Sequence, residues 1–174
     1  MAFADQVRDV LSDTMNLPSE FLNFLPQFIA QNPVAAPRIA GQEVAFGSRN
    51  ATVAATGTTF ATGTDLLSAP LEFTATGQGS YILYVFAAGW SNTNIGTSNS
   101  LYLNLDGASG GVFCQSSSTT ANAIMGCTSA SYISAPSQGR HSVNARLVVG
   151  SGTGSVFGAS ASGYLPILLS LRVA

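Results

Sequence analysis

The sequence holds few side chains suited to acid–base or nucleophilic catalysis. His141 is its single histidine, and a Ser-His-Asp triad would need it as the base, but it lies in a turn that enters an expected strand, without a nucleophile elbow. The strand-rich part of the chain has only four carboxylates to place across a cleft, as glycoside hydrolysis requires: Glu43, Asp65, Glu72 and Asp106. Glu72 is expected on an exposed strand face and Asp106 in an Asp-Gly turn. We therefore predict that the protein is not an enzyme.

Composition excludes several further classes of protein. The chain of 174 residues and 17.8 kDa suits one domain with a small appendage. It has six Arg and no Lys, which excludes Schiff-base chemistry and a Walker phosphate loop. A single His cannot supply the imidazoles of a typical catalytic zinc site, so we expect no metal and no cofactor. The net charge of −2, without a basic stretch, argues against a nucleic-acid partner.

Neither a membrane span nor a secretory signal is expected. No uninterrupted apolar stretch approaches the roughly 18 residues that a span needs. Asp5, Arg8, Asp9 and Asp13 occupy positions where a signal peptide would be apolar.

Two cysteines, Cys114 and Cys127, flank a Ser/Thr-rich segment. If the flanks pair as a hairpin, the sulfur atoms would meet and could form a disulfide, as suits a protein that is made in a cytoplasm and later exposed to an oxidising exterior. The alternative is a pair of small buried thiols. Spacing alone does not decide between them, and no third or fourth ligand is in view for a metal.

Trp90 is a candidate recognition residue. It ends an apolar segment and precedes the polar sequence SNTNIG. An aromatic ring beside Asn92 and Asn94 on a loop would suit sugar stacking combined with hydrogen bonding. The alternative is that Trp90 closes one end of the β domain.

Three regions must position these residues: a helical segment over 1–31, a Pro/Ala/Gly linker over 32–42, and a strand-rich domain over 43–174. Apolar and polar residues alternate in several parts of the domain, among them 71–75 and 142–149, as is typical of half-buried strands. Many short strands without crossover helices predict a mainly β fold, an antiparallel sandwich or jelly roll.

The segment over 1–31 is expected to form two amphipathic helices, separated near Asn16 and Pro18. They either pack on their own domain or dock onto other subunits, and the linker behind them favours docking. The predicted anchoring residues are their apolar side chains: Phe3, Val7, Val10, Leu11, Phe21, Phe24, Leu25 and Phe28.

The segment 81–88, YILYVFAA, is apolar on both faces. Such a strand must be covered on both sides, and in a small sandwich the second cover can be another subunit. Arg140, Arg146 and Arg172 are each expected on the polar side of a strand, where they bind a neighbouring subunit or stay solvated. The predicted interface residues are Tyr81, Leu83, Tyr84, Phe86, Leu168 and Arg172.

Three segments resemble the trimeric TNF/C1q-like jelly rolls found in phage fibre knobs, capsid decoration proteins and spore-surface proteins. They are GQGSYILYVFAAGW, SLYLNLDG, and SQGRHSVNARLVVGSGTG followed by YLPILLSLRVA, and together they cover roughly residues 70–174. The resemblance implies a homotrimer with no common catalytic residues to carry over. A helical segment before such a knob resembles the particle-attachment segment of phage virion proteins.

These resemblances imply a non-enzymatic virion protein, assembled in the host cytoplasm. It would be a capsid decoration or cement knob that docks on major capsid or tail proteins through residues 1–31. The alternative is a receptor-binding tail-fibre tip that recognises a host-surface glycan.

Overall fold

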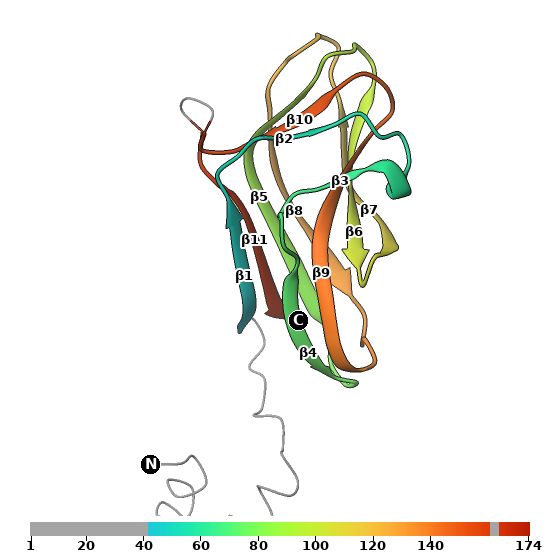
Figure 1. The fold of residues 1–174 in the computed structure, drawn as a ribbon, viewed down its shortest axis with the longest axis vertical. Coiled ribbons are helices and arrows are strands. Elements are labelled where there is room, and N and C mark those ends of the chain that lie inside the picture. Colours follow the sequence, from blue (N-terminus) through green and yellow to red (C-terminus); the bar gives the residue numbers. More distant parts are fainter. Residues whose placement is uncertain (1–41, 161–163) are drawn as a thin grey trace, which may run out of the picture. The chain divides into compact units, whose positions relative to one another are not determined.

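Figure 1 shows the fold in a computed structural model that describes residues 42–160 and 164–174. The described residues belong to one compact unit, Ile39–Ala174. The helices expected over 1–31, with every predicted anchoring residue from Phe3 to Phe28, lie outside the described residues, as does the linker except for Gln42.

The described part consists of strands in two sheets and a single 3-10 turn, η1 (Phe60–Thr62). Sheet A is formed by β1 (Glu43–Arg49), β11 (Ile167–Val173), β5 (Tyr81–Asn92) and β8 (Met125–Ile133), with β10 (Gly154–Phe157) and β2 (Val53–Ala55) extending it at one end. Sheet B is formed by β3 (Thr64–Asp65), β4 (Leu71–Thr76), β9 (Gln138–Val149), β6 (Ser98–Leu105) and β7 (Ala108–Ser117).

The strand pairings described within both sheets are antiparallel. The chain passes repeatedly between the sheets, with β4, β6, β7 and β9 in sheet B and β5 and β8 in sheet A. Among the described residues there is no α-helix. The prediction of a mainly β, antiparallel fold is therefore confirmed.

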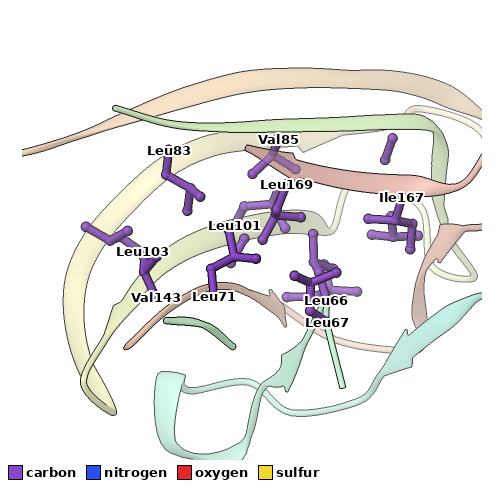
Figure 2. Packing of buried hydrophobic residues seen from close by; sticks show 14 of the residues in the cluster. Leu66, Leu67, Leu71, Leu83, Val85, Leu101, Leu103, Val143, Ile167 and Leu169 are labelled. Atoms are coloured by element: carbon purple, nitrogen blue, oxygen red, sulfur yellow. The ribbon is translucent and has the colours of Figure 1, made fainter. Parts of the chain in front are cut away.

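The hydrophobic core lies between the two sheets and is filled by alternate residues of their strands (Figure 2). Leu71 and Phe73 of β4 are buried while Glu72 between them is exposed, as the period of two in a strand requires. From sheet A, Leu169 and Leu171 enter the same core. Burying a side chain of this size contributes about 1.5–3 kcal/mol to stability, so the core accounts for much of the fold.

The segment 57–67 pairs with the edge of β9 and folds over part of the outer face of sheet B, where the Phe60 ring packs on Arg146 and Tyr102. Leu66 N–H donates to the Ala145 carbonyl at 2.8 Å, and Val149 N–H donates to the Gly57 carbonyl at 3.0 Å. The Asn144 side chain exchanges hydrogen bonds with the Leu67 backbone at 2.9 and 3.1 Å. Because of this cover, the second half of β9 is buried on both faces of the sheet.

Candidate interaction surface

The outer face of sheet A carries aromatic side chains that nothing in the described residues covers. Phe46 is 54% exposed, Tyr84 44%, Phe86 36% and Tyr132 61%. They come from β1, β5 and β8, while β11 supplies the half-buried Leu168. We call this set the outer aromatic face: Phe46, Ile82, Tyr84, Phe86, Tyr132 and Leu168.

Strand register places these side chains in neighbouring rows. In one row Tyr84 lies between Ser170 of β11 and Ala130 of β8, and Phe46 follows on the far side of Ser170. Phe86 lies beside Leu168 in the next row. Because directly opposed side chains in antiparallel strands are close neighbours, the aromatic rings form one contiguous surface.

A charged pair stands at the rim of the outer aromatic face. The Arg172 guanidinium lies 3.9 Å from the Glu43 carboxylate, and both side chains are half exposed. Ser170 Oγ donates to Glu43 Oε2 at 2.9 Å, and Arg172 Nε donates to Ser170 Oγ at 3.3 Å. An apolar centre with a polar, hydrogen-bonded rim is the usual anatomy of a protein–protein interface.

Four of the six predicted interface residues lie on this surface or its rim: Tyr84, Phe86, Leu168 and Arg172. Tyr81 and Leu83 do not, because they are buried in the core between the sheets, where Tyr81 packs on Phe73 with 4.9 Å between ring centroids. The prediction that they form a subunit interface is therefore wrong.

Two further aromatic residues of the surface, Phe46 and Tyr132, were missed by sequence reasoning. Each lies in a strand with little apolar alternation of its own, EVAFGSR and MGCTSASYI. Only their register beside β11 and β5 brings them onto this face.

The predicted glycan-contact residues do not form a sugar platform. Trp90 is 1% exposed and Asn92 is 3% exposed, so neither can touch a ligand at the surface. The pairing of β5 with β8 shifts register between Ala87 and Trp90, and Asn92 Nδ2 donates to Asn99 Oδ1 at 2.9 Å in the interior. Trp90 instead helps to close the end of the core.

Asn94 is the one predicted glycan-contact residue that is exposed. Its Nδ2 donates to Ser151 Oγ at 3.1 Å, and Ser151 Oγ also lies 2.8 Å from Thr97 Oγ1. These bonds join the β5–β6 loop to the β9–β10 loop. The hydroxyl and amide groups therefore stabilise the end of the domain.

Both ring nitrogens of His141 face hydrogen-bond acceptors of the chain. Its Nδ1 is 2.6 Å from Asp106 Oδ2 and its Nε2 is 2.8 Å from the Ser137 carbonyl oxygen. Since both ring nitrogens face acceptors, the protonated imidazolium, which donates from both, fits the site best. The hydrogen bond to Asp106 and then that to Ser137 raise the pKa of His141 above its usual 6.5.

Arg146 and Asp65 form a two-pronged ion pair. Arg146 Nε donates to Asp65 Oδ1 at 2.7 Å and Nη2 donates to Oδ2 at 2.8 Å. The guanidinium carbon also lies 4.7 Å from the centre of the Phe60 ring, and Asn104 Nδ2 donates to the same carboxylate at 3.0 Å. The hydrogen bond with Asp65 is the main cause that raises the pKa of Arg146. The pair fastens the covering segment to sheet B.

Within the described residues there is no group of three or more His, Cys, Asp or Glu side chains placed to hold a metal ion. The same residues include no helix long and apolar enough to cross a membrane.

Comparisons with known proteins identify no family. No family model matches the chain, and no curated protein matches it. Among solved structures, a cycloisomaltooligosaccharide glucanotransferase of Paenibacillus sp., complexed with cycloisomaltoheptaose, is 18% identical, with a TM-score of 0.25. The match covers 77% of this chain but only 17% of that enzyme. A similarity of this size supports no argument about fold, activity or ligand.

Proposed function

We propose that the protein is a non-enzymatic structural knob that assembles as a homotrimer through the outer aromatic face of sheet A. The observation that carries the proposal is the contrast between the two sheets. The outer face of sheet B is largely polar, with Glu72 and Arg140 exposed and Phe60 packed over Arg146, whereas sheet A exposes Phe46, Tyr84, Phe86 and Tyr132. An exposed aromatic surface of this kind is best explained by a partner that covers it.

The size of the surface supports the same conclusion. Four strands about 4.8 Å apart and about seven residues long span a sheet face of roughly 400 Å². The largest apolar patch on a typical soluble monomer measures about 300–600 Å² and is often functional, so a face of this size is compatible with an interaction site. In a trimer the interface is heterologous, so the aromatic rings of one copy would pack on a different part of the next copy, and Glu43 or Arg172 at the rim could pair with charges there.

The strand order supports a jelly roll as the architecture of the knob. A jelly roll has eight strands in two four-stranded antiparallel sheets. The rows β1-β11-β5-β8 and β4-β9-β6-β7 fit that description, once the short strands β2, β3 and β10 are set aside.

We further propose that the knob is a phage virion protein, a capsid decoration or cement protein docked through residues 1–31. In Figure 1, β1 starts at the lower end of the domain. The loops that carry Asn94 and Ser151 lie at the opposite end of β5 and β9, and would project from the particle. A glycan-binding tip is not part of this proposal, because Trp90 and Asn92 are buried.

The native mass of the full-length protein tests the trimer. Light scattering on a sizing column should give three chains of 17.8 kDa. A monomer at working concentration would contradict the proposal, because the outer aromatic face would then need no partner chain.

Deleting residues 1–31 tests the docking. The shortened protein should remain a folded trimer and should no longer bind virus particles assembled without it, while the full-length protein binds them. Binding by the shortened protein would place the docking surface on the β domain instead.

A further inference from the structure

Cys114 and Cys127 lie where the free edges of the two sheets meet. Cys114 belongs to β7, which ends sheet B, and Cys127 belongs to β8, which ends sheet A. Their sulfur atoms are 3.9 Å apart, as two free thiols in contact. Cys127 is buried in the core and Cys114 packs against it, so both side chains point toward the space between the sheets.

We propose that these two cysteines form an intramolecular disulfide, which joins sheet A to sheet B when the protein meets an oxidising environment. The inference does not depend on the trimer. A disulfide needs sulfur atoms about 2.0 Å apart, so the pair must approach by about 1.9 Å.

Strand β7 is suited to make this approach. It is an edge strand, and most of its residues are exposed. Its pairing with β6 already shifts register on both sides of Tyr102. A small movement of β7 therefore costs few backbone hydrogen bonds.

The neighbouring contacts hold the two edges in register around the cysteines. Ser129 Oγ donates to the Phe113 carbonyl at 3.2 Å on one side of the pair. On the other side, Ser116 Oγ lies 4.0 Å from Met125 Sδ. A neutral hydrogen bond contributes little net stability, so a covalent bond would be the strongest link along this edge.

The oxidant we propose is a small-molecule disulfide, and the step is a thiol–disulfide exchange. The Cys114 thiolate attacks one sulfur of the oxidant, which releases one small thiolate and leaves a mixed disulfide on Cys114. Cys127 then attacks the Cys114 sulfur, the mixed bond breaks, and the second small thiolate leaves with the Cys127 proton. The protein loses two protons and two electrons, which together are two hydrogen atoms, and the oxidant gains them and becomes two thiols.

The order of attack follows from exposure. Burial, followed by the nearby Cys114, raises the pKa of Cys127 to about 12, so its thiolate is scarce in free solution. The half-buried Cys114 is the thiol that an external oxidant reaches first.

The experiment treats reduced full-length protein with oxidised glutathione. We expect free thiols to fall from two per chain to none, and the mass to fall by two hydrogen atoms without an adduct. The disulfide closes the loop from Cys114 to Cys127, so the midpoint of thermal unfolding should rise by roughly 5–10 °C. Dithiothreitol should reverse all three changes.

The matched control is Cys114→Ser, which keeps the size and polarity of the side chain but removes one sulfur. It should show no rise in the unfolding midpoint under the same oxidant. The proposal is overturned if the natural protein keeps both thiols, carries a stable glutathione adduct, or forms disulfides between chains on a non-reducing gel. These readouts use the unmodified protein, so they remain decisive even if a variant fails to fold.

Discussion

Asp106 and His141 are joined by a hydrogen bond of 2.6 Å that fastens the turn between β6 and β7 to the start of β9. The other carboxylate oxygen of Asp106 accepts from the Ser142 backbone N–H at 2.7 Å. Phe73 of β4 packs on the imidazole, with 5.5 Å between ring centroids. Four separate parts of the chain therefore meet at this pair, counting the Ser137 carbonyl that binds the second ring nitrogen.

The pair should make stability depend on pH in a defined window. Partial burial acts to raise the pKa of Asp106, but the Ser142 amide, the His141 hydrogen bond and the His141 charge together lower it below 3.8. The contribution of the Asp106 carboxylate to folding stability is fully present above pH 3.8 and is lost as the pH falls through the lowered pKa. The contribution of the His141 imidazolium to folding stability is fully present below pH 6.5 and is lost as the pH rises through its raised pKa. We expect the pair to stabilise the fold most between these two values.

The variant Asp106→Asn tests this window. It keeps an oxygen for the Ser142 N–H and suits the positive φ of 52° at this position, but it removes the charge. We expect a loss of about 1 kcal/mol near pH 5, because the carboxylate is half exposed, and a loss that shrinks as the pH rises past the folded pKa of His141. NMR titration should show the pKa of His141 falling in this variant.

The matched control is Glu72→Gln, which neutralises a carboxylate paired with Arg140 at 3.9 Å at the same end of the domain. It should leave the pKa of His141 unchanged. An equal shift of the His141 pKa in both variants would mean that the overall charge of the protein, and not the contact with Asp106, stabilises the imidazolium.

The strands were predictable from sequence wherever one of their faces is buried. In β4 and β11 the apolar residues alternate because one side of the strand packs in the core. The same rule fails for β5, where both faces are apolar. The sequence alone could not say that Tyr81 and Leu83 point inward while Tyr84 and Phe86 point outward, since that choice is set by which sheet packs opposite.

Contacts between residues far apart in the sequence account for the other differences between the sequence-based predictions and the structure. Arg146 was expected to be solvated or to bind a neighbouring subunit, but it bonds to Asp65, which is 81 residues away along the chain. Trp90 was a candidate recognition residue with closure of one end of the domain as the alternative, and the irregular pairing of β5 with β8 next to it ends with the indole buried. Neither contact leaves a periodic signal in the sequence.

Replacing Arg146 should destabilise the fold through the cover of sheet B. Its side chain is 19% exposed and that of Asp65 is 30% exposed. We expect Arg146→Ala to cost about 2 kcal/mol, since it leaves Asp65 partly buried without its partner. Arg146→Lys should cost about 1 kcal/mol, because an ammonium group cannot make the two-pronged contact. Denaturant unfolding followed by circular dichroism measures both losses.

Arg140 provides the matched control, because its side chain is 82% exposed and its contact with Glu72 is long. Arg140→Ala should cost less than about 0.5 kcal/mol. A loss as large as that of Arg146→Ala would show that the two arginines act through net charge and not through contacts.

Trp90 should behave as a core residue and not as a binding residue. We expect Trp90→Ala to destabilise the protein by about 3–5 kcal/mol, because the removed ring leaves a cavity. Trp90→Phe should cost less, about 1–2 kcal/mol, since Trp90 Nε1 has no hydrogen-bond partner among the described atoms. Ile95→Ala, on the exposed loop nearby, should change stability by less than about 0.5 kcal/mol. A stable Trp90→Ala protein would contradict the buried position.

If the proposed trimer forms through the outer aromatic face, charges on that face should separate the subunits without unfolding them. In the double variant Tyr84→Arg and Phe86→Arg, each guanidinium would be buried against another copy without a carboxylate to pair with, which strongly disfavours association. The strand itself should persist, because Val85 and Leu83 on the opposite side of β5 keep the core intact. We expect light scattering to fall from three chains to one while the circular dichroism spectrum stays that of a folded β protein.

Val112→Arg is the control for this experiment. Val112 is also a half-exposed apolar residue, but it lies on β7 at the edge of sheet B, so the variant should remain a trimer. If Val112→Arg separates the chains and the double variant does not, the contact between subunits runs along the β7 edge. The outer aromatic face would then need a different cover.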